Sequence, residues 1–72
     1  MNYTVNDEPR SADTAPTVAE VVAAETGREV SDVEGAKGVA VAVNRSVVPA
    51  SDWERALSEG DAVDILIAVQ GG

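Results

Sequence analysis

The chain has 72 residues, enough for one small domain that buries only about 60% of the surface its unfolded chain exposes. Its apolar share of 44% is mostly Val and Ala, and it contains no Cys, no His and no Phe. Without Cys and His it lacks the commonest nucleophile, the commonest neutral-pH base and the soft metal ligands, so we expect no disulfide, no metal site, no bound cofactor and no self-contained enzyme.

Thirteen acidic and five basic residues give a formal net charge of −8 at pH 7. A polyanionic surface repels phosphate backbones and anionic lipid headgroups, so we expect no nucleic-acid or membrane partner and consider a basic protein surface a suitable one. The N-terminus lacks the basic and apolar regions of a secretory signal, and no stretch approaches the roughly 20 apolar residues of a membrane span. These features predict a cytoplasmic protein.

The N-terminal segment predicts a β-hairpin. Tyr3 and Val5 alternate with polar neighbours, and Asp7-Glu8-Pro9 then supplies turn-forming residues. Residues 10–13 can return as a second short strand.

A helix is expected from about residue 17 to Thr26. Thr17-Val18-Ala19-Glu20 has the form of a capping box, and Pro16 blocks earlier growth of the helix. Gly27 stands where a glycine commonly ends a helix. One face of this helix is apolar because valines recur at helical spacing: Val18, Val21 and Val22.

The middle of the chain predicts an irregular connection and then a second hairpin. Residues 28–38 are charged and interrupted by glycines. Residues 39–43 alternate valine with alanine and form the clearest strand. Asn44-Arg45-Ser46 suits a tight turn into Val47-Val48, and Pro49 ends that strand or confines it to a sheet edge.

A short helix or a 3₁₀ segment is expected next, because Ser51-Asp52-Trp53-Glu54 repeats the form of a capping box. Trp53, Ala56 and Leu57 would then face the body of the protein. Trp53 could anchor a partner, but in a chain with so few large side chains we expect it to close the edge of the core.

The last strand is predicted over residues 62–69, after a turn at Glu59-Gly60-Asp61. One sheet with one main helix on it is the simplest way to bury the valine faces together. We expect one domain over residues 1–69 and a flexible tail over residues 70–72. Alternation in the last strand predicts one face with Val63, Ile65, Ile67 and Val69 and another with Asp64, Leu66 and Ala68.

The tail Gln70-Gly71-Gly72 carries the candidate chemistry. Glycines at a terminus fit an unstructured end equally well, if the dipeptide is considered alone. Three extended residues nevertheless reach roughly 10 Å, and glycine lets a backbone enter a channel too narrow for side chains. The Gly72 carboxylate could therefore be delivered into the active site of another protein.

A free α-carboxylate is anionic at neutral pH, with a reference pKa of about 3.3–3.7, and resists nucleophiles until it is activated. Adenylation by a partner that uses ATP would supply a good leaving group. A sulfur nucleophile could then leave a thiocarboxylate on the chain. The absence of cysteine fits this scheme, because any sulfur carried would reside on the terminus.

Several spaced motifs in residues 39–72 carry a family resemblance. They are Val41-Ala42-Val43-Asn44, Val47-Val48-Pro49, Trp53, Glu59-Gly60-Asp61, and the run from Ile65 to Val69 that leads into Gln70-Gly71-Gly72. Together they resemble the C-terminal half of the ThiS family, the sulfur carriers of thiamine biosynthesis. Residues 28–38 match the family pattern least.

The resemblance implies an α+β fold of the ubiquitin-like β-grasp type, with a mixed sheet of about five strands, one main helix and one short helix. It implies adenylation of Gly72 by an E1-like enzyme, conversion to a thiocarboxylate, and delivery of sulfur to thiazole synthase. Gln70 and Gly71 would thread into the partner, and a sulfur donor such as a cysteine desulfurase would be needed.

Partner contacts are expected close to the tail. The acidic residues Glu54, Glu59, Asp61 and Asp64 could form an acidic face for a basic groove, although most charged faces are merely solvated. Leu66 is a candidate contact if the helix covers the opposite face of its strand.

Three other functions remain open from the sequence. The small subunit of molybdopterin synthase shares the fold and the tail, but the Val47-Val48-Pro49 and Trp53 pattern favours thiamine. A ubiquitin-like modifier of protein lysines would also use a glycine tail. A binding module with an accidental glycine terminus is the last alternative.

Overall fold

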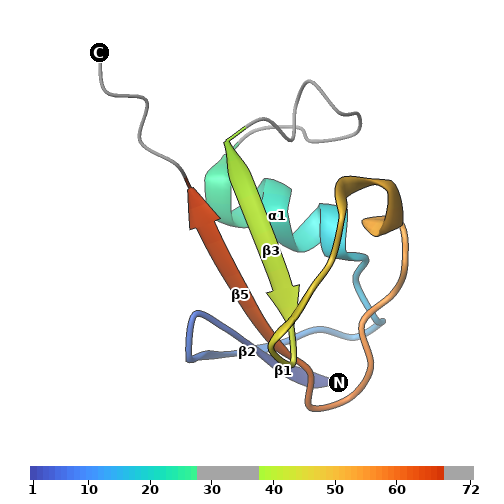
Figure 1. The fold of residues 1–72 in the computed structure, drawn as a ribbon. Coiled ribbons are helices and arrows are strands. Elements are labelled where there is room, and N and C mark those ends of the chain that lie inside the picture. Colours follow the sequence, from blue (N-terminus) through green and yellow to red (C-terminus); the bar gives the residue numbers. More distant parts are fainter. Residues whose placement is uncertain (28–37, 68–72) are drawn as a thin grey trace.

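The computed structural model describes residues 1–27 and 38–67 (Figure 1). The predicted order of hairpin, helix, hairpin, short helix and last strand is confirmed within these residues. The elements are β1 (Asn2–Val5), β2 (Glu8–Ser11), α1 (Val18–Thr26), β3 (Val39–Val43), β4 (Ser46–Val47), the 3₁₀ helix η1 (Ala50–Asp52) and β5 (Ala62–Ile67).

One mixed five-stranded sheet runs in the order β2-β1-β5-β3-β4. β1 and β5 are parallel, whereas the other neighbouring strands are antiparallel. α1 lies behind β3 and β5 in Figure 1 and covers one face of the sheet. The fold is therefore the predicted two-layer α+β arrangement, and the connection predicted over residues 28–38 lies outside the described residues apart from Gly38.

The core lies between α1 and the sheet, and small branched side chains fill it. Alternation sends every second residue of the central strands toward the helix, which is why valines are repeated in β3 and β5. Burial of a Val, Leu or Ile side chain contributes about 1.5–3 kcal/mol. The buried residues are Val5, Val18, Val21, Val22, Val41, Val43, Val48, Trp53, Leu57, Val63 and Ile65.

Both ends of α1 follow the sequence signals. The backbone N–H of Glu20 donates to Thr17 Oγ1 at 3.1 Å, and the N–H of Thr17 donates to Glu20 Oε1 at 2.9 Å, which completes the capping box. Gly27 ends the helix with a φ of 71°, and its N–H donates to the carbonyl of Ala23 at 2.8 Å. A left-handed residue at this position favours glycine because it has no Cβ.

The first hairpin forms, but its turn lies earlier than predicted. Asn6 and Asp7 occupy the two turn positions with φ of 50° and 68°, and β2 begins at Glu8 rather than at residue 10. Tight two-residue hairpin turns need positive φ, which Asn and Asp tolerate better than most residues. Pro9 is tolerated in β2 because this is an edge strand of the sheet.

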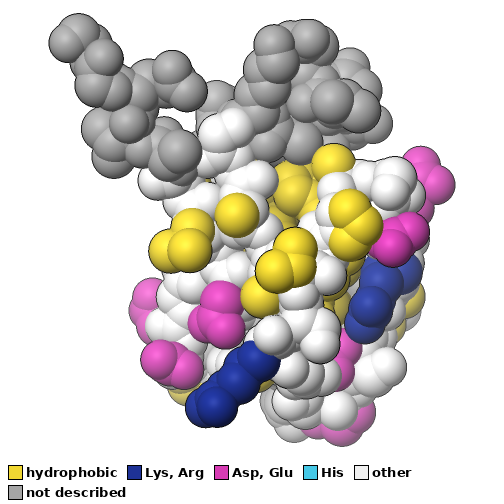
Figure 2. Space-filling model, in the orientation of Figure 1, with side chains coloured by type: hydrophobic (Ala, Val, Ile, Leu, Met, Phe, Trp, Pro, Cys, Tyr) yellow, Lys and Arg dark blue, Asp and Glu magenta, His cyan; other side chains and the backbone are white. Residues whose placement is uncertain are grey.

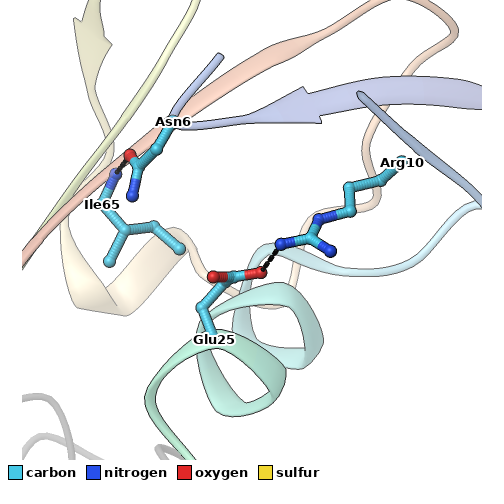
Figure 3. Close-up of polar contacts among 4 residues, drawn as sticks. All are labelled: Asn6, Arg10, Glu25 and Ile65. Atoms are coloured by element: carbon cyan, nitrogen blue, oxygen red, sulfur yellow. Dashed lines mark hydrogen bonds and ion pairs between the residues drawn. The ribbon is translucent and has the colours of Figure 1, made fainter. Parts of the chain in front are cut away.

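The hairpin is joined to α1 by an ion pair between Arg10 of β2 and Glu25 of the helix, with an N–O distance of 2.6 Å (Figure 3). Both side chains are partly exposed. A pair of this kind contributes about 0–1 kcal/mol, so it orients the hairpin more than it stabilises the fold.

The second hairpin has the predicted tight turn. Asn44 and Arg45 have φ of 51° and 70°, and β4 covers Ser46–Val47, one residue earlier than expected. Val48 follows the strand as a buried residue, and its N–H donates to the carbonyl of Val41 at 2.9 Å.

The predicted capping box at Ser51 is wrong. The 3₁₀ helix begins at Ala50, Pro49 precedes it, and no side chain caps its N-terminus. The helix covers only three residues, so helical spacing does not extend to Ala56, which is exposed instead of facing the core. Leu57 is nevertheless buried, because residue 56 forms an isolated β-bridge with Thr17 that brings this segment against the start of α1.

Asn6 offers a test of how the first turn is fixed. Its side chain Oδ1 accepts a hydrogen bond from the Ile65 N–H at 2.8 Å. Asn6→Gly keeps the positive φ and loses this bond, at a cost of about 0.5–1.5 kcal/mol, whereas Asn6→Ala adds a left-handed penalty of about 1–2 kcal/mol. Urea unfolding followed by circular dichroism should therefore rank wild type, Gly and Ala in falling stability. Equal stability of the two variants would show that backbone strain plays no part.

Candidate functional site at the end of strand β5

The predicted reactive tail begins at Gln70, three residues after Ile67, where the described part of β5 ends. Gln70, Gly71 and Gly72 lie outside the described residues, as do the last two residues of the predicted strand, so the boundary between domain and tail stays a prediction. The structure describes the strand that leads to them. The site is therefore built from β5 and its surroundings.

β5 is a central strand, held on both sides. It pairs with β3 over its whole described length, from Val43↔Val63 to Val39↔Ile67. On the other side the N–H of Asn6 donates to the carbonyl of Val63 at 2.8 Å, and the N–H of Ile65 donates to Asn6 Oδ1 (Figure 3). These bonds and the pairing with β3 fix the position of β5 in the sheet.

The sheet face opposite α1 carries an apolar surface next to the end of β5. Leu66 is 73% exposed there and Val47 is 80% exposed, and Figure 2 shows hydrophobic side chains gathered over this part of the molecule. Leu66 is thus exposed, as expected if α1 covers the other face of β5, while its role as a contact residue stays a prediction. A shallow concavity of about 340 Å³ lies beside it, lined by Gly38, Val39, Ala40, Leu66 and Ile67.

Three of the four candidate acidic residues are exposed. They are Glu54, Glu59 and Asp64, and the Glu59 carboxylate accepts hydrogen bonds from the N–H of Asn2 at 3.0 and 3.1 Å. Glu59 therefore also holds the start of β1, whereas Asp64 lies on the same face of β5 as Leu66. These positions leave Glu59 and Asp64 available as candidate partner contacts.

Asp61 does not belong to an exposed acidic face, contrary to the prediction. It is only 7% exposed, and both carboxylate oxygens are used within the chain. Oδ1 accepts from Asn44 Nδ2 at 2.9 Å, and Oδ2 accepts from the N–H of Ser58 at 2.8 Å. Buried charged groups need such partners, so Asp61 joins the turn before β5 to the β3–β4 turn.

Asn44 completes this junction from the other side. Its Oδ1 accepts from the N–H of Ala62 at 2.9 Å, and its own N–H donates to the carbonyl of Ala62 at 2.7 Å. Sequence reasoning assigned Asn44 to a turn and to a family motif but predicted no contact for its side chain, and it gave Asn6 no role. In both cases the signal was an Asn in a two-residue turn, where a short amide side chain reaches the neighbouring backbone.

Trp53 is a core residue, as predicted. It is 3% exposed, and its indole Nε1 donates to the carbonyl of Val48 at 2.9 Å. The indole therefore closes the core beside Val48, the residue that follows β4.

The described residues contain no group of three or more acidic, His or Cys side chains that could hold a metal ion. No helix in this part of the chain is long and apolar enough to cross a membrane. The described surface thus offers a strand end, an apolar patch and acidic side chains, which suit protein contact.

Comparisons with known proteins agree with this architecture. The fold is that of a ubiquitin-like β-grasp protein, and the ThiS family model matches residues 3–72. The chain belongs to the ThiS family. No protein of curated function matches it significantly.

Two solved structures are similar over the whole chain. A crystal structure of the thiamine biosynthesis protein ThiS from Geobacter metallireducens is 32% identical, with a TM-score of 0.69 and full coverage of both chains. A solution structure of a thiamine biosynthesis protein from the same organism gives 32% identity and a TM-score of 0.68, covering all of this chain and 88% of the other. The family and these neighbours support a sulfur carrier of thiamine biosynthesis.

A substitution at Asp61 tests its structural role. Asp61→Ala leaves the Asn44 amide and the Ser58 N–H without their partner, so it should destabilise the fold by about 1–3 kcal/mol. Glu54→Ala is the matched control, because this exposed acid should change stability by no more than about 0.5 kcal/mol. Denaturant midpoints of the two variants and of the wild-type chain, measured by circular dichroism, give these changes in stability. Similar denaturant midpoints for the two variants would contradict a structural role for Asp61 and would favour the predicted role in an exposed acidic face.

Proposed function

We propose that this chain is a cytoplasmic sulfur carrier whose Gly72 carboxylate is adenylated, converted to a thiocarboxylate and used to supply the sulfur of the thiazole ring of thiamine. The observation that carries the proposal is the ThiS family match over residues 3–72, which includes the terminal Gly71 and Gly72. The chain is thus a protein co-substrate and not an enzyme.

The proposed chemistry follows from the properties of a carboxylate. Its negative charge resists nucleophiles, so a partner must first convert it to an acyl adenylate at the expense of ATP. Pyrophosphate leaves in this step. A sulfur nucleophile then attacks the acyl carbon and AMP leaves: hydrosulfide gives the thiocarboxylate directly, whereas a persulfide gives an acyl disulfide that a thiol must then reduce. We propose an E1-like adenylating enzyme for the first step, a cysteine desulfurase as the source of sulfur, and thiazole synthase as the recipient.

The described surface supports a carrier that docks on these enzymes. Leu66 offers an exposed apolar side chain at the end of β5, and Asp64 and Glu59 add negative charge nearby in the chain. An acidic carrier is attracted to a basic groove, and exposed charge pairs are screened beyond about 10 Å at 0.1 M salt. Gln70 and Gly71 would extend from this surface into the active site.

The first test is the intact mass of the chain after incubation with the adenylating enzyme, ATP and a sulfur donor. Gly72 should exchange one oxygen for one sulfur, detected by mass spectrometry.

Two variants serve as controls: a chain that lacks Gly71 and Gly72, and a Gly71→Val chain. Both should fold with nearly unchanged denaturant midpoints and acquire no sulfur, the first because it lacks the reactive terminus and the second because β-branching restricts the backbone and adds bulk. A mass that corresponds to the chain joined to protein lysines would support a modifier instead.

A second test addresses the pathway. A strain that lacks this chain should need thiamine or its thiazole moiety for growth and should still make molybdenum cofactor. Complementation with the wild-type chain, but not with the chain lacking Gly71 and Gly72, provides the control. Loss of molybdoenzyme activity with normal thiamine synthesis would assign the chain to molybdopterin synthase.

A further inference from the structure

On the side where β5 pairs with β1, β5 extends past the point at which β1 ends. The N–H of Thr4 in β1 donates to the carbonyl of Asp61, just before β5, at 3.0 Å. The N–H of Asn6, just after β1, donates to the carbonyl of Val63 at 2.8 Å. At the next position the Asn6 side chain accepts from the N–H of Ile65 in place of a backbone carbonyl (Figure 3). The positive φ of Asn6 then turns the chain away from β5.

The backbone groups that follow have no such neighbour within residues 1–27 and 38–67. Successive residues of a strand direct their N–H and C=O groups to opposite sides. The Ile65 carbonyl and the Ile67 N–H therefore point to the same side as the Ile65 N–H, away from β3. β1 has ended at Val5, and β2 runs back along the far side of β1.

The true edges of the sheet are protected against pairing with other chains. β2 contains Pro9 between the charged residues Glu8 and Arg10, and β4 has two residues and is soon followed by Pro49. Short strands, prolines and charges are the usual devices that keep edges from pairing. The open end of β5 has none of them, because its residues are Leu66 and Ile67.

The side chains at this end of β5 are exposed on both faces of the sheet. Leu66 is exposed on the face opposite α1, and Ile67 is 52% exposed although it alternates with the buried Val63 and Ile65. An apolar strand end with an open backbone edge is a template for strand addition.

We propose that an extended segment of the adenylating enzyme pairs with this edge of β5, as an added strand that continues the line of β1. The proposal rests on the proposed function, which requires that enzyme to hold the residues after β5. Its chemistry points to a polypeptide, since an extended backbone offers an acceptor to the Ile67 N–H and a donor to the Ile65 carbonyl at strand spacing. The added strand would align the tail for entry into the active site.

A second copy of this chain fits the edge less well. Each copy carries a net charge of −8, and Asp64 lies within β5 itself, so pairing two β5 edges would bring like charges together. The proposed function, by contrast, requires the adenylating enzyme to bind the residues that follow β5 in the sequence.

Amide exchange measured by NMR tests the proposal on the full chain labelled with ¹⁵N. In the free chain the Ile67 amide should exchange fast, while the Leu66 amide, which faces Ala40 of β3, should be protected. Saturation with the adenylating enzyme should slow exchange at Ile67 by roughly tenfold or more. If the complex forms and the exchange rate of the Ile67 amide is unchanged, the proposal is wrong. The proposal is also wrong if the Ile67 amide of the free chain becomes more protected as the chain concentration increases, because that result would indicate pairing with a second copy.

Two variants separate backbone pairing from side-chain packing. Ile67→Pro removes the N–H at the open edge, whereas Ile67→Ala keeps it and removes most of the side chain. Ile67→Pro should raise the Kd for the enzyme at least about tenfold above that of Ile67→Ala, with both thermal midpoints close to each other. Equal Kd values for the two folded variants would assign the contact to side chains and overturn the proposal.

The intact-mass measurement of sulfur on the wild-type chain distinguishes failure of strand addition from failure of the proposed sulfur-carrier function. Sulfur acquired without protection of Ile67 overturns strand addition and leaves the sulfur-carrier function standing. If the wild-type chain neither binds the enzyme nor acquires sulfur, the proposed function fails, and strand addition by that enzyme fails with it.

Discussion

The pairing of β5 with strands on both sides is the constraint on which the rest of the structure depends. β5 is last in the chain but central in the sheet, between β1 and β3, and it places Val63 and Ile65 against the helix. The domain therefore cannot close its core until its last strand is in place. The same arrangement fixes the position of Ile67, the last residue of β5, through its register with Val39 of β3.

Much of this fold could be predicted from local signals that act within a few residues. The capping box of Thr17 and Glu20, the terminating Gly27 and the alternating valines of β3 each specify a local geometry, and tertiary packing agrees with them. The Ser51 capping box failed because the same letters occur in a segment whose geometry is set by distant contacts. There, bonds from the start of α1 to the backbone of residues 53 and 55 hold a single 3₁₀ turn and leave no room for a longer helix.

Features of the candidate site that follow from residue order along one strand could be predicted from the sequence. Features that depend on which side chains become buried could not. The exposure of Leu66 follows from alternation along β5 once one face is assigned to the helix. Glu59 and Asp61 are two residues apart and look equivalent in the sequence, yet one is exposed and the other is buried against Asn44. That difference arises from the meeting of two turns that are distant in the chain, which no local pattern records.

Trp53 gives the protein a built-in optical reporter. It is the single tryptophan of the chain, and its buried indole donates to the carbonyl of Val48. Its backbone N–H donates to the carbonyl of Ala50, and its carbonyl accepts from the N–H of Ala19 at the start of α1. None of these hydrogen bonds involves the end of β5. Intrinsic fluorescence therefore reports on the folding of the core independently of events at the terminus, and a variant that loses activity while it keeps the native emission maximum has lost function without losing its fold.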